Sequence, residues 1–260
     1  MFVNYITMKY NHGMNTEKSL IDIPVLLMLF NRPETTKRVF EKLREARPSK
    51  LFIAANGPRP GMASDMQSCQ AVRDIFRSID WECEVHTNYR EINIGMQPHW
   101  RLAMDWFFEH VDAGIILEDD CVPDTSFLSF SKELLEKYKD NENVMHINGS
   151  NFQFGKKRGE ASYYFSKYPS SWGWATWKRA WQRYNNTILD FPEFMKKNML
   201  DTFVTSKKEK RFWMKMLSEL ASGKQDGCDT KWAYAIWSHD GICITPNVNM
   251  IRNIGFGSTA

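Results

Sequence analysis

The 260-residue chain has few of the features that mark disulfide-rich, zinc-binding or membrane-spanning proteins. Its five cysteines are scattered, odd in number and without C-x-x-C spacing, which argues against a disulfide framework or zinc site and fits a reducing compartment. The longest apolar run, Ile23–Phe30, is too short to cross a bilayer. The first twenty residues lack the continuous apolar stretch of a signal peptide. We therefore expect a cytoplasmic protein, with peripheral attachment to a membrane left open.

An excess of one charge sign is also missing, since the net charge of +3 is close to neutral. No basic stripe with interleaved aromatic residues is present, so nucleic acid is a poor candidate partner. Glycine-rich phosphate loops are absent too. Neither G-x-G-x-x-G nor G-x-x-x-x-G-K-[ST] follows a strand-like segment, which excludes a dinucleotide-binding fingerprint and a P-loop. A nucleotide bound here needs another way of holding its phosphates.

Aromatic residues are plentiful instead. Ten Trp, nine Tyr and seventeen Phe make up 14% of the chain, and most of the Trp lie in its second half. Flat indole faces pack on sugar rings, but large cores also use tryptophan. The excess is therefore a weak indication of carbohydrate binding.

The order of apolar segments predicts an α/β domain. Strand-like runs and helical periodicities alternate as β-α-β-α-β-α-β through residue 120, which is typical of a mostly parallel sheet with helices on both faces. The expected strands are residues 23–30, 51–55, 82–87 and 114–117, and the expected helices follow Pro33 and cover residues 67–78 and 97–110.

The second half is less regular. We expect helices over residues 127–138, 175–184, 206–222 and 229–237, and strands over 144–147 and 242–245. Residues 1–20 are expected to form a poorly ordered leader. Residues 21–260 are expected to form one domain, with a nucleotide-binding half over 21–120 and an acceptor and sugar half over 121–260.

Three consecutive carboxylates, Glu118, Asp119 and Asp120, end the apolar strand Gly114–Leu117. Open α/β sheets bind ligands at the carboxyl ends of their strands, and adjacent carboxylates repel one another unless a cation is bound. A Mg²⁺ or Mn²⁺ ion held by one or two carboxylates stabilises the charge that develops on a diphosphate leaving group. The alternative is a solvated acidic turn, and the strand context favours the metal site.

Several stretches of the chain resemble GT-A-type glycosyltransferases of the nucleotide-diphospho-sugar transferase superfamily, most of all the N-acetylglucosaminyltransferase I-like group. They are VLLMLFNRPETTKRVFEKL, HWRLAMDWFF, IILEDDCVPDTSFLSF, SSWGWATW and WAYAIWSHDGICITPNVNMIRNIGFG, in the expected order between residues 23 and 257. The resemblance implies the GT-A fold and transfer from a nucleotide-sugar donor, with a UDP-sugar expected. It also implies a glycan, lipid-linked glycan or other hydroxyl acceptor, and dependence on Mn²⁺ or Mg²⁺.

The resemblance further implies roles for single residues. Asp120 would be the direct metal ligand, Asp119 would lie near the donor ribose, and Glu118 near the transferred sugar. This DXD-like motif would therefore serve both the metal and the donor.

Three further positions match the nucleotide side of similar enzymes. Arg32 and His99 match residues that meet the nucleotide, although a helix-surface role for His99 is an equal alternative. Asn56 stands where these enzymes often carry an aspartate to the uracil. An amide can also hydrogen-bond a pyrimidine edge.

Inverting sugar transfer needs a carboxylate base from a segment other than the metal-binding one. Asp229 precedes an apolar-periodic helix, where an N-cap is the ordinary role of aspartate. The resemblance instead implies that Asp229 is the catalytic base. Asp226, Glu219 and Asp240 are further alternatives.

The segment Ser170–Trp177 contains three tryptophans. Trp172 and Trp174 are candidates for sugar contact, with core packing as the alternative, and Gly173 permits close backbone approach. The asparagine-rich segment Pro246–Gly255 is expected to close over the donor. Similar enzymes continue with a histidine-containing tail, so a late metal-binding histidine is not expected in this sequence.

Two other function classes remain open. A nucleotidyltransferase that makes sugar nucleotides would need a glycine-rich basic loop after the first strand, and the residues Phe30–Glu34 lack those glycines. A non-catalytic glycan- or nucleotide-binding protein on the same fold would bind a nucleoside diphosphate without metal and without turnover.

Overall fold

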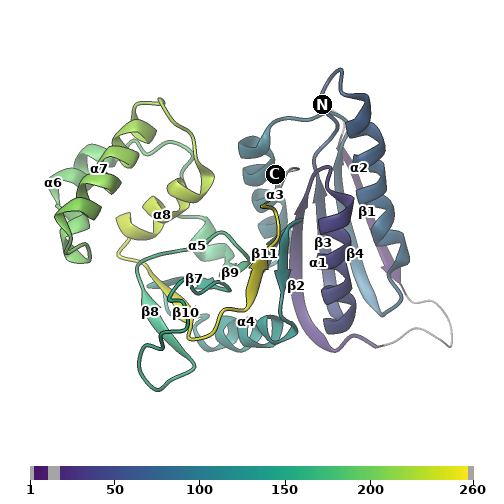
Figure 1. The fold of residues 1–260 in the computed structure, drawn as a ribbon, viewed down its shortest axis with the longest axis horizontal. Helices are drawn as coiled ribbons and strands as arrows, with labels where there is room; N and C mark the ends of the chain where they lie inside the picture. Colours follow the sequence, from purple (N-terminus) through teal and green to yellow (C-terminus); the bar gives the residue numbers. More distant parts are fainter. Residues whose placement is uncertain (1–2, 11–17, 257–260) are drawn as a thin grey trace.

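The computed structural model describes residues 3–10 and 18–256 (Figure 1). Within these ranges, nine strands form one sheet in the order β1-β4-β3-β2-β5-β9-β7-β10-β8, and β11 pairs with β6. The strands are β1 (Val3–Tyr10), β2 (Ile21–Leu29), β3 (Pro48–Ala55), β4 (Cys83–Arg90), β5 (Ala113–Glu118), β6 (Cys121–Pro123), β7 (Val144–Asn148), β8 (Tyr163–Ser166), β9 (Trp174–Trp177), β10 (Ile242–Pro246) and β11 (Ile251–Asn253). The helices are α1 (Pro33–Ala46), α2 (Ala63–Ile75), η2 (Phe76–Ser78), α3 (Met96–His110), α4 (Thr125–Lys137), α5 (Lys178–Trp181), α6 (Phe191–Lys196), η3 (Met199–Thr202), α7 (Lys207–Ala221) and α8 (Cys228–Ser238).

The sheet is mixed, with a parallel centre. Strands β4, β3, β2 and β5 run parallel to one another, as do β7 and β10. Strands β1, β8 and β9 pair antiparallel with their neighbours. The expected α/β class, with helices on both faces of the sheet, is confirmed, and the parallel part of the sheet is its centre.

Strand β2 shows why helices cover both faces. Successive side chains of a strand point to opposite faces. Accordingly, Val25 and Leu27 share one core with α1, α2 and α4, whereas Leu26 and Met28 share another with α3 and α8. A strand buried on both faces reads as a continuous apolar run. Figure 1 shows α1 and α2 lying across one face of the β2–β4 strands.

The direction of the chain across the sheet reverses between β2 and β5. Helices α1 and α2 lead from β2 outward to β3 and β4 over one face, whereas α3 leads back over the other face to β5. The carboxyl ends of β2 and β5 are therefore adjacent, with their connections diverging to opposite faces. Such a switch point is where open α/β sheets bind ligands.

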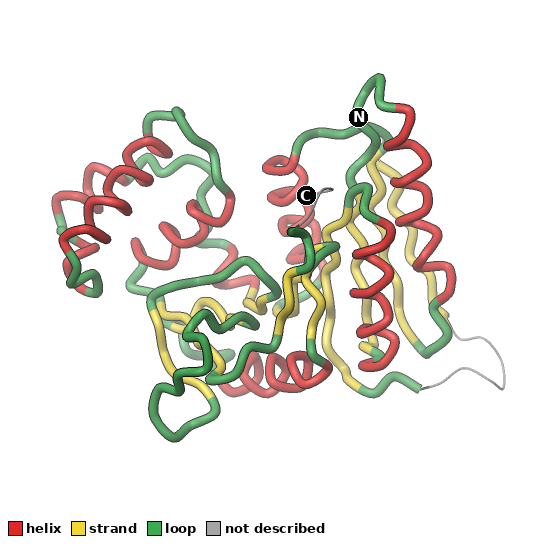
Figure 2. Tube along the Cα trace, in the orientation of Figure 1, coloured by secondary structure: helices red, strands yellow, loops and turns green. Residues whose placement is uncertain are grey.

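The helices of the second half extend the α3 side of the molecule. Leu217 of α7 and Trp232 of α8 belong to the same core as Trp100 of α3. Figure 2 shows α6, α7 and α8 as a group of helices set apart from the α1–α2 layer. Among the helices in the described ranges, none is both long and apolar enough to span a membrane.

Two expectations from the sequence are wrong in part. Residues 3–10 of the expected leader form β1, which pairs along the edge of β4. Its β-branched and aromatic residues favour a strand, and the β4 edge offers an unpaired backbone ladder. Residues 1–2 and 11–17 lie outside the described residues. The helix expected over residues 175–184 begins only at Lys178, because Trp174–Trp177 pairs with both β5 and β7.

Candidate active site

A cavity of about 850 Å³, here called the carboxyl-end cavity, opens at the switch point. Its walls come from the carboxyl ends of β2, β3 and β5, from the first turns of α3 and α8, and from the segment after β11. The lining residues are Met28, Leu29, Phe30, Asn31, Arg32, Asn56, Arg59, Asn93, Met96, His99, Trp100, Glu118, Asp119, Asp120, Ser171, Trp172, Cys228, Asp229, Asn253, Gly255 and Phe256. All the site residues expected from the sequence except Trp174 are in this set.

The acidic triplet is held by the end of the neighbouring strand β2. Glu118 ends β5, and Asp119 and Asp120 form the turn that follows, each 8% exposed. The Nη1 atom of Arg32 lies 3.0 Å from Asp120 Oδ2 and 3.7 Å from Asp119 Oδ1. The backbone N–H of Phe30 donates to Asp119 Oδ2 at 3.3 Å. Two carboxylates therefore meet one guanidinium at the switch point.

The three carboxyl groups of the triplet outnumber the single guanidinium of Arg32 that lies beside them. Burial, reinforced by Asp120 and Asp119, raises the pKa of Glu118 to about 8. Burial also raises the pKa of Asp119 to about 7, against the opposing effect of Arg32. Each carboxyl group thus resists ionisation while its neighbours are charged. A bound cation would reverse that effect.

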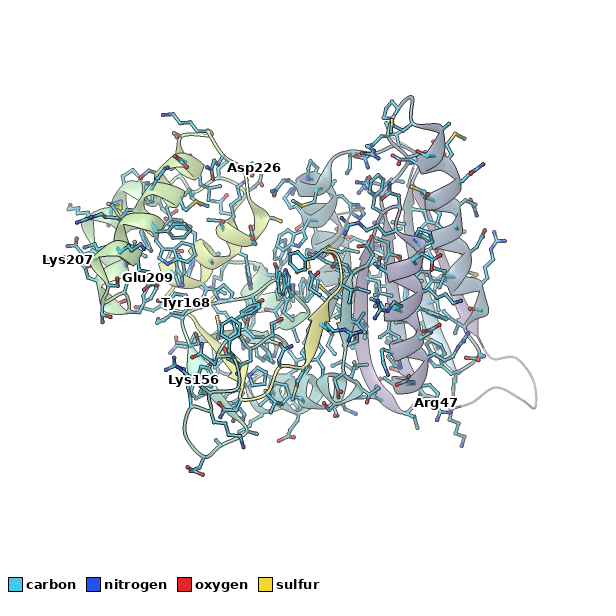
Figure 3. All side chains as sticks on the ribbon, in the orientation of Figure 1. Arg47, Lys156, Tyr168, Lys207, Glu209 and Asp226 are labelled. Atoms are coloured by element: carbon cyan, nitrogen blue, oxygen red, sulfur yellow. The ribbon has the colours of Figure 1, made fainter. Side chains whose placement is uncertain are left out.

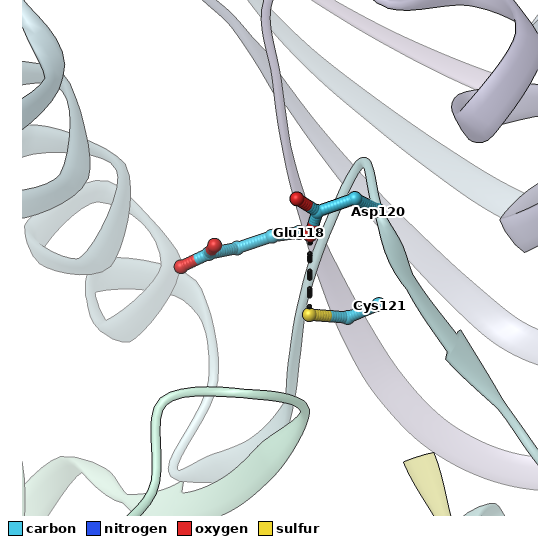
Figure 4. Close-up of side chains that lie close together, drawn as sticks. All are labelled: Glu118, Asp120 and Cys121. Atoms are coloured by element: carbon cyan, nitrogen blue, oxygen red, sulfur yellow. Dashed lines mark hydrogen bonds between the residues drawn. The ribbon is translucent and has the colours of Figure 1, made fainter. Parts of the chain in front are cut away.

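The donor atoms at this cluster suit a hard divalent cation. One ligand atom each of Glu118, Asp120 and Cys121 lies within 4.8 Å of the other two (Figure 4). The Cys121 thiol donates to Asp120 Oδ1 at 3.4 Å, and burial raises its pKa far above the usual range. A thiol that stays protonated is a poor ligand, whereas carboxylate oxygens suit Mg²⁺ and Mn²⁺. The residues present therefore fit such an ion held by Glu118 and Asp120.

The segment after β11 lies directly against Asp120. The backbone N–H of Ile254 donates to the Asp120 carbonyl at 2.9 Å. The Asn253 side-chain amide lies 3.5 Å from Asp120 Oδ1. A Cβ atom at Gly255 would lie 2.0 Å from Asp120 Oδ2, so only glycine allows this approach. The asparagine-rich segment expected to close over a donor thus covers one side of the acidic triplet.

The side chain of Asn56, which follows β3, makes hydrogen bonds within the protein. Its Oδ1 atom accepts hydrogen bonds from the backbone N–H groups of Gly57, at 3.0 Å, and Ile94, at 3.2 Å. Its Nδ2 atom donates to the Gly95 carbonyl at 3.3 Å. The side chain therefore joins the loops that follow β3 and β4, and its second amide hydrogen faces no protein partner in the described residues.

His99 lies in the first turns of α3 and is 7% exposed, so its helix-surface interpretation is wrong. Burial, together with the positive charge of Arg90, lowers the pKa of His99 to about 4. The ring is neutral at physiological pH. Neither ring nitrogen has a partner at hydrogen-bond geometry among the described residues. The backbone of Ala54 favours the protonated ring, but burial outweighs this effect on the pKa. The His99 imidazole therefore lines the cavity with both ring nitrogens shielded from solvent.

The sequence analysis did not single out Arg59, which lies in the loop after β3. The carboxylate of Asp65, 1% exposed, accepts from Arg59 Nε at 2.6 Å and from Nη2 at 2.9 Å. Asp65 also accepts from the Asn31 amide at 2.8 Å, and the guanidinium lies 5.5 Å from the centre of the Phe30 ring. The only sequence signal for Arg59 as a site residue is its position after an expected strand. Its partner Asp65 lies on α2, and the sequence alone does not show that the two meet.

Asp229 lies in the first turn of α8. Gly227 is the N-cap residue, so the capping interpretation of Asp229 is wrong. The Oδ1 atom of Asp229 accepts from the Thr230 N–H at 2.8 Å. Its charge also contributes to the raised pKa of Glu118, which places the two carboxylates near each other.

A second cavity of about 290 Å³, here called the side cavity, adjoins the first. Its lining residues are Trp100, Phe152, Pro169, Ser170, Ser171, Trp172, Trp174, Trp213, Asp229, Thr230, Trp232 and Ala233. The residues that line both cavities are Trp100, Ser171, Trp172 and Asp229. Asp229 therefore stands at their junction, whereas the acidic triplet lines the larger cavity.

The other carboxylates considered as bases line neither cavity in the described part of the chain. Each has a lysine partner: Asp226 with Lys231, Glu219 with Lys215 and Asp240 with Lys167. Asp229 is therefore the candidate base that its position supports.

The two candidate sugar-binding tryptophans lie in different surroundings. Trp172 is half-buried between two exposed rings, with its ring centre 5.2 Å from that of Phe152 and 5.4 Å from that of Phe256. Trp174 is 1% exposed and stacks on His146, with ring centres 4.9 Å apart. A bound sugar could reach Trp172 directly, whereas Trp174 belongs to the core behind the side cavity.

Comparison with solved structures shows a distant likeness in fold. No family model and no curated protein matches the chain. Among solved structures, the chain is similar to the crystal structure of mouse xyloside xylosyltransferase 1 in its apo form. The TM-score is 0.39 at 12% sequence identity, over 83% of this chain and 81% of that chain. A likeness this distant carries no argument about activity, and it does not bear on the N-acetylglucosaminyltransferase I-like group.

Proposed function

We propose that this chain is a metal-dependent, inverting glycosyltransferase that moves a sugar from a nucleotide-diphosphate donor to a hydroxyl group of a glycan. The observation that carries the proposal is the position of Asp229. One carboxylate lines both the cavity that contains the acidic triplet and the side cavity next to it. A transferase needs such a group where donor and acceptor meet.

The residues at the ends of β2 and β5 would bind the donor. Arg32 pairs with Asp120 in the free protein, and the oxygens of a diphosphate would compete for the same guanidinium. Glu118 and Asp120 would hold a Mn²⁺ or Mg²⁺ ion, which as a Lewis acid stabilises the charge on the departing diphosphate. Asn56 and His99 would contact the nucleotide from the β3 and β4 side.

Asp229 would act as the general base. It would take the proton of the acceptor hydroxyl while that oxygen forms a bond to the anomeric carbon and the bond from that carbon to the phosphate oxygen breaks. Inversion requires the base and the leaving group on opposite faces of the sugar. Placing the base on α8 and the acidic triplet on β5 is consistent with that requirement, and Trp172 would form a wall of the acceptor site.

The motifs described above support membership of the N-acetylglucosaminyltransferase I-like group and a UDP-sugar donor as parts of this proposal. The roles of Asp119 at the ribose and of Glu118 at the transferred sugar belong to it as well. The scattered cysteines support a cytoplasmic location.

A thermal-shift screen of nucleoside diphosphates with and without Mn²⁺ tests the proposal. A ligand that binds only the native state stabilises it by about 2.7 kcal/mol at 100 times its Kd. We expect UDP with Mn²⁺ to raise Tm more than either alone. Equal shifts with and without metal, without donor hydrolysis, would favour a non-catalytic binding protein. Release of pyrophosphate from a nucleoside triphosphate and a sugar phosphate would favour a nucleotidyltransferase.

A further inference from the structure

The connection between β7 and β8 presents an aromatic ring and a run of basic side chains to solvent. This segment, residues 151–162, is here called the Phe154 loop. Phe154 is 93% exposed, the highest value among the large apolar residues of the described chain, and Phe152 is 49% exposed. Lys156, Lys157 and Arg158 follow directly and are exposed. Figure 3 labels Lys156, which lies on the loop that projects beside β8.

Both ends of the Phe154 loop are hydrogen-bonded to the turn after β10. The Asn247 side chain donates to the carbonyls of Arg158, at 2.9 Å, and Ala161, at 2.7 Å, and it accepts from the Arg158 N–H at 2.8 Å. The Asn151 amide donates to the Pro246 carbonyl at 2.6 Å. These bonds tie both ends of the loop to the turn after β10. The exposure of Phe154 is therefore a feature of a defined conformation.

That conformation is locally unfavourable. Phe154 has φ 52° and Gly155 has φ 83°, so both residues are left-handed. Glycine adopts this region readily, whereas a bulky aromatic residue does so rarely and at a cost. The turn directs the ring away from the core, where its burial would have stabilised the fold. Within the described residues, a ring that is 93% exposed contributes little burial to the fold, which points to a partner outside the molecule.

We propose that the Phe154 loop docks on the surface of an anionic lipid bilayer, with Phe154 at the boundary between headgroups and acyl chains. The three basic side chains of the loop outweigh its one carboxylate, Glu160, and would meet the anionic headgroups. Stable peripheral attachment generally needs two such signals together. Lysine is depleted in protein–protein interfaces, so a single aromatic tip beside a Lys-Lys-Arg run fits a membrane better than a protein partner.

Cosedimentation of the full chain with vesicles tests this docking. We expect binding to vesicles of phosphatidylcholine mixed with phosphatidylglycerol, little binding to phosphatidylcholine alone, and weakening with salt. The double variant Lys156→Glu and Lys157→Glu should lower the partition coefficient by about fivefold for each basic side chain lost, and further through the added repulsion. Phe154→Ala should lower it by about tenfold.

Matched surface changes elsewhere provide the controls. Lys207→Glu with Lys208→Glu alters an exposed lysine pair on α7, and Leu189→Ala removes another apolar side chain, 81% exposed. Neither control should change vesicle binding. Absence of binding to anionic vesicles would refute the docking and leave a protein partner as the occupant of this surface. Equal binding to neutral vesicles, or the same loss in the controls, would refute it as well.

This docking is independent of the proposed transfer. Phe154 and the basic run do not contribute to the walls of the carboxyl-end cavity. The shift in Tm with UDP and Mn²⁺ should therefore be the same in the loop variants and the wild type. Loss of vesicle binding and failure of the transferase proposal would then be seen in separate measurements.

Discussion

Two cavities of similar volume lie at opposite ends of β2 and β5. The carboxyl-end cavity measures about 850 Å³, and a second, the amino-end cavity, measures about 810 Å³. The amino-end cavity is lined by Asp22, Ile23, Pro24, Asp112, Ala113, Lys132, Leu135, Glu136, Lys139, Trp177, Lys178, Arg179 and Gln182. Both contain acidic and basic side chains, so neither volume nor the presence of charge tells them apart.

The difference lies in how the charges are held. At the amino end, Asp22 and Asp112 are exposed, and Arg179 donates to backbone carbonyls. At the carboxyl end, Asp119 and Asp120 are buried beside Glu118 with a shared arginine. Buried charge without full neutralisation is costly to a protein. It is therefore a better mark of a functional site than a hollow of the same size.

The largest expected effect separates catalysis from donor binding within the carboxyl-end cavity. Asp229→Asn should lower kcat by about 10²–10⁴-fold because an amide cannot accept the acceptor's proton. Donor affinity should remain, which single-turnover transfer and calorimetry can resolve together. Asp226→Asn is the control, since Asp226 lines neither the carboxyl-end cavity nor the side cavity and pairs with Lys231. Transfer at the wild-type rate in Asp229→Asn would remove the proposed base.

The next effect compares the two ends of β5 directly. Asp120→Asn should weaken binding of UDP with Mn²⁺ by about 100-fold, since losing one partner of a buried charge pair costs about 2–5 kcal/mol. Asp112→Asn, exposed at the start of the same strand, should leave the affinity unchanged. Calorimetry of both variants gives the comparison. Equal affinities would mean that the buried cluster does not bind the nucleotide.

A smaller effect tests the close approach over the acidic triplet. Gly255→Ala would place a methyl group 2.0 Å from Asp120 Oδ2, so the segment after β11 must shift. We expect a loss of about 1–3 kcal/mol in the free energy of unfolding, as for other overpacked sites, together with weaker nucleotide binding. Gly61→Ala is the control, because nothing lies within 4 Å of its added Cβ and only the strain of φ +78° is tested. Identical denaturation curves for the two variants would contradict the close approach.

The last effect, which is small within any one pH unit, concerns the pH dependence of stability. Because the pKa of Glu118 is raised to about 8 in the folded protein, the folded state holds a proton that the unfolded state has released above pH 4.5. The contribution of protonated Glu118 to the free energy of unfolding is fully present below pH 4.5. It is lost as pH rises through about 8, by at most about 1.4 kcal/mol per pH unit. Glu118→Gln should flatten the stability profile of the metal-free protein in that range. Denaturation from pH 4.5 to 8 measures it, with the exposed Glu136→Gln at the amino-end cavity as control. Parallel profiles for Glu118→Gln and the wild type would argue against the crowded cluster.

The central strands and the gathering of the candidate residues could be predicted from the sequence. Strands β2 and β5 are buried on both faces, so their continuous apolar runs identify them as strands from the local sequence alone. Arg32, Asn56 and Glu118 each lie at or just after the carboxyl end of a parallel strand, and the carboxyl ends of parallel strands meet at one edge. This placement needs only local periodicity and the handedness of crossovers, whereas the choice of Arg32 and Asn56 as site residues came from the resemblance to glycosyltransferases.

Other features depend on partners that are far apart in the sequence. The local pattern of residues 175–177 favours a helix, but pairing with β5 and β7 on either side makes them part of strand β9. The ion pair with Asp65 on α2 positions Arg59. The close approach of Asp120, next to the β6–β11 pair, is what requires glycine at position 255. No local pattern in any of these segments encodes the partner's position.

By itself, the amino-acid sequence determined the α/β class and which residues end the parallel strands, because side-chain periodicity and burial are local consequences of residue type. Only the tertiary structure decided that Asp229 lies at the junction of two cavities, that Trp174 is in the core, and that Phe154 projects into solvent. These are relations between distant segments, and packing and backbone pairing across the whole chain settle them.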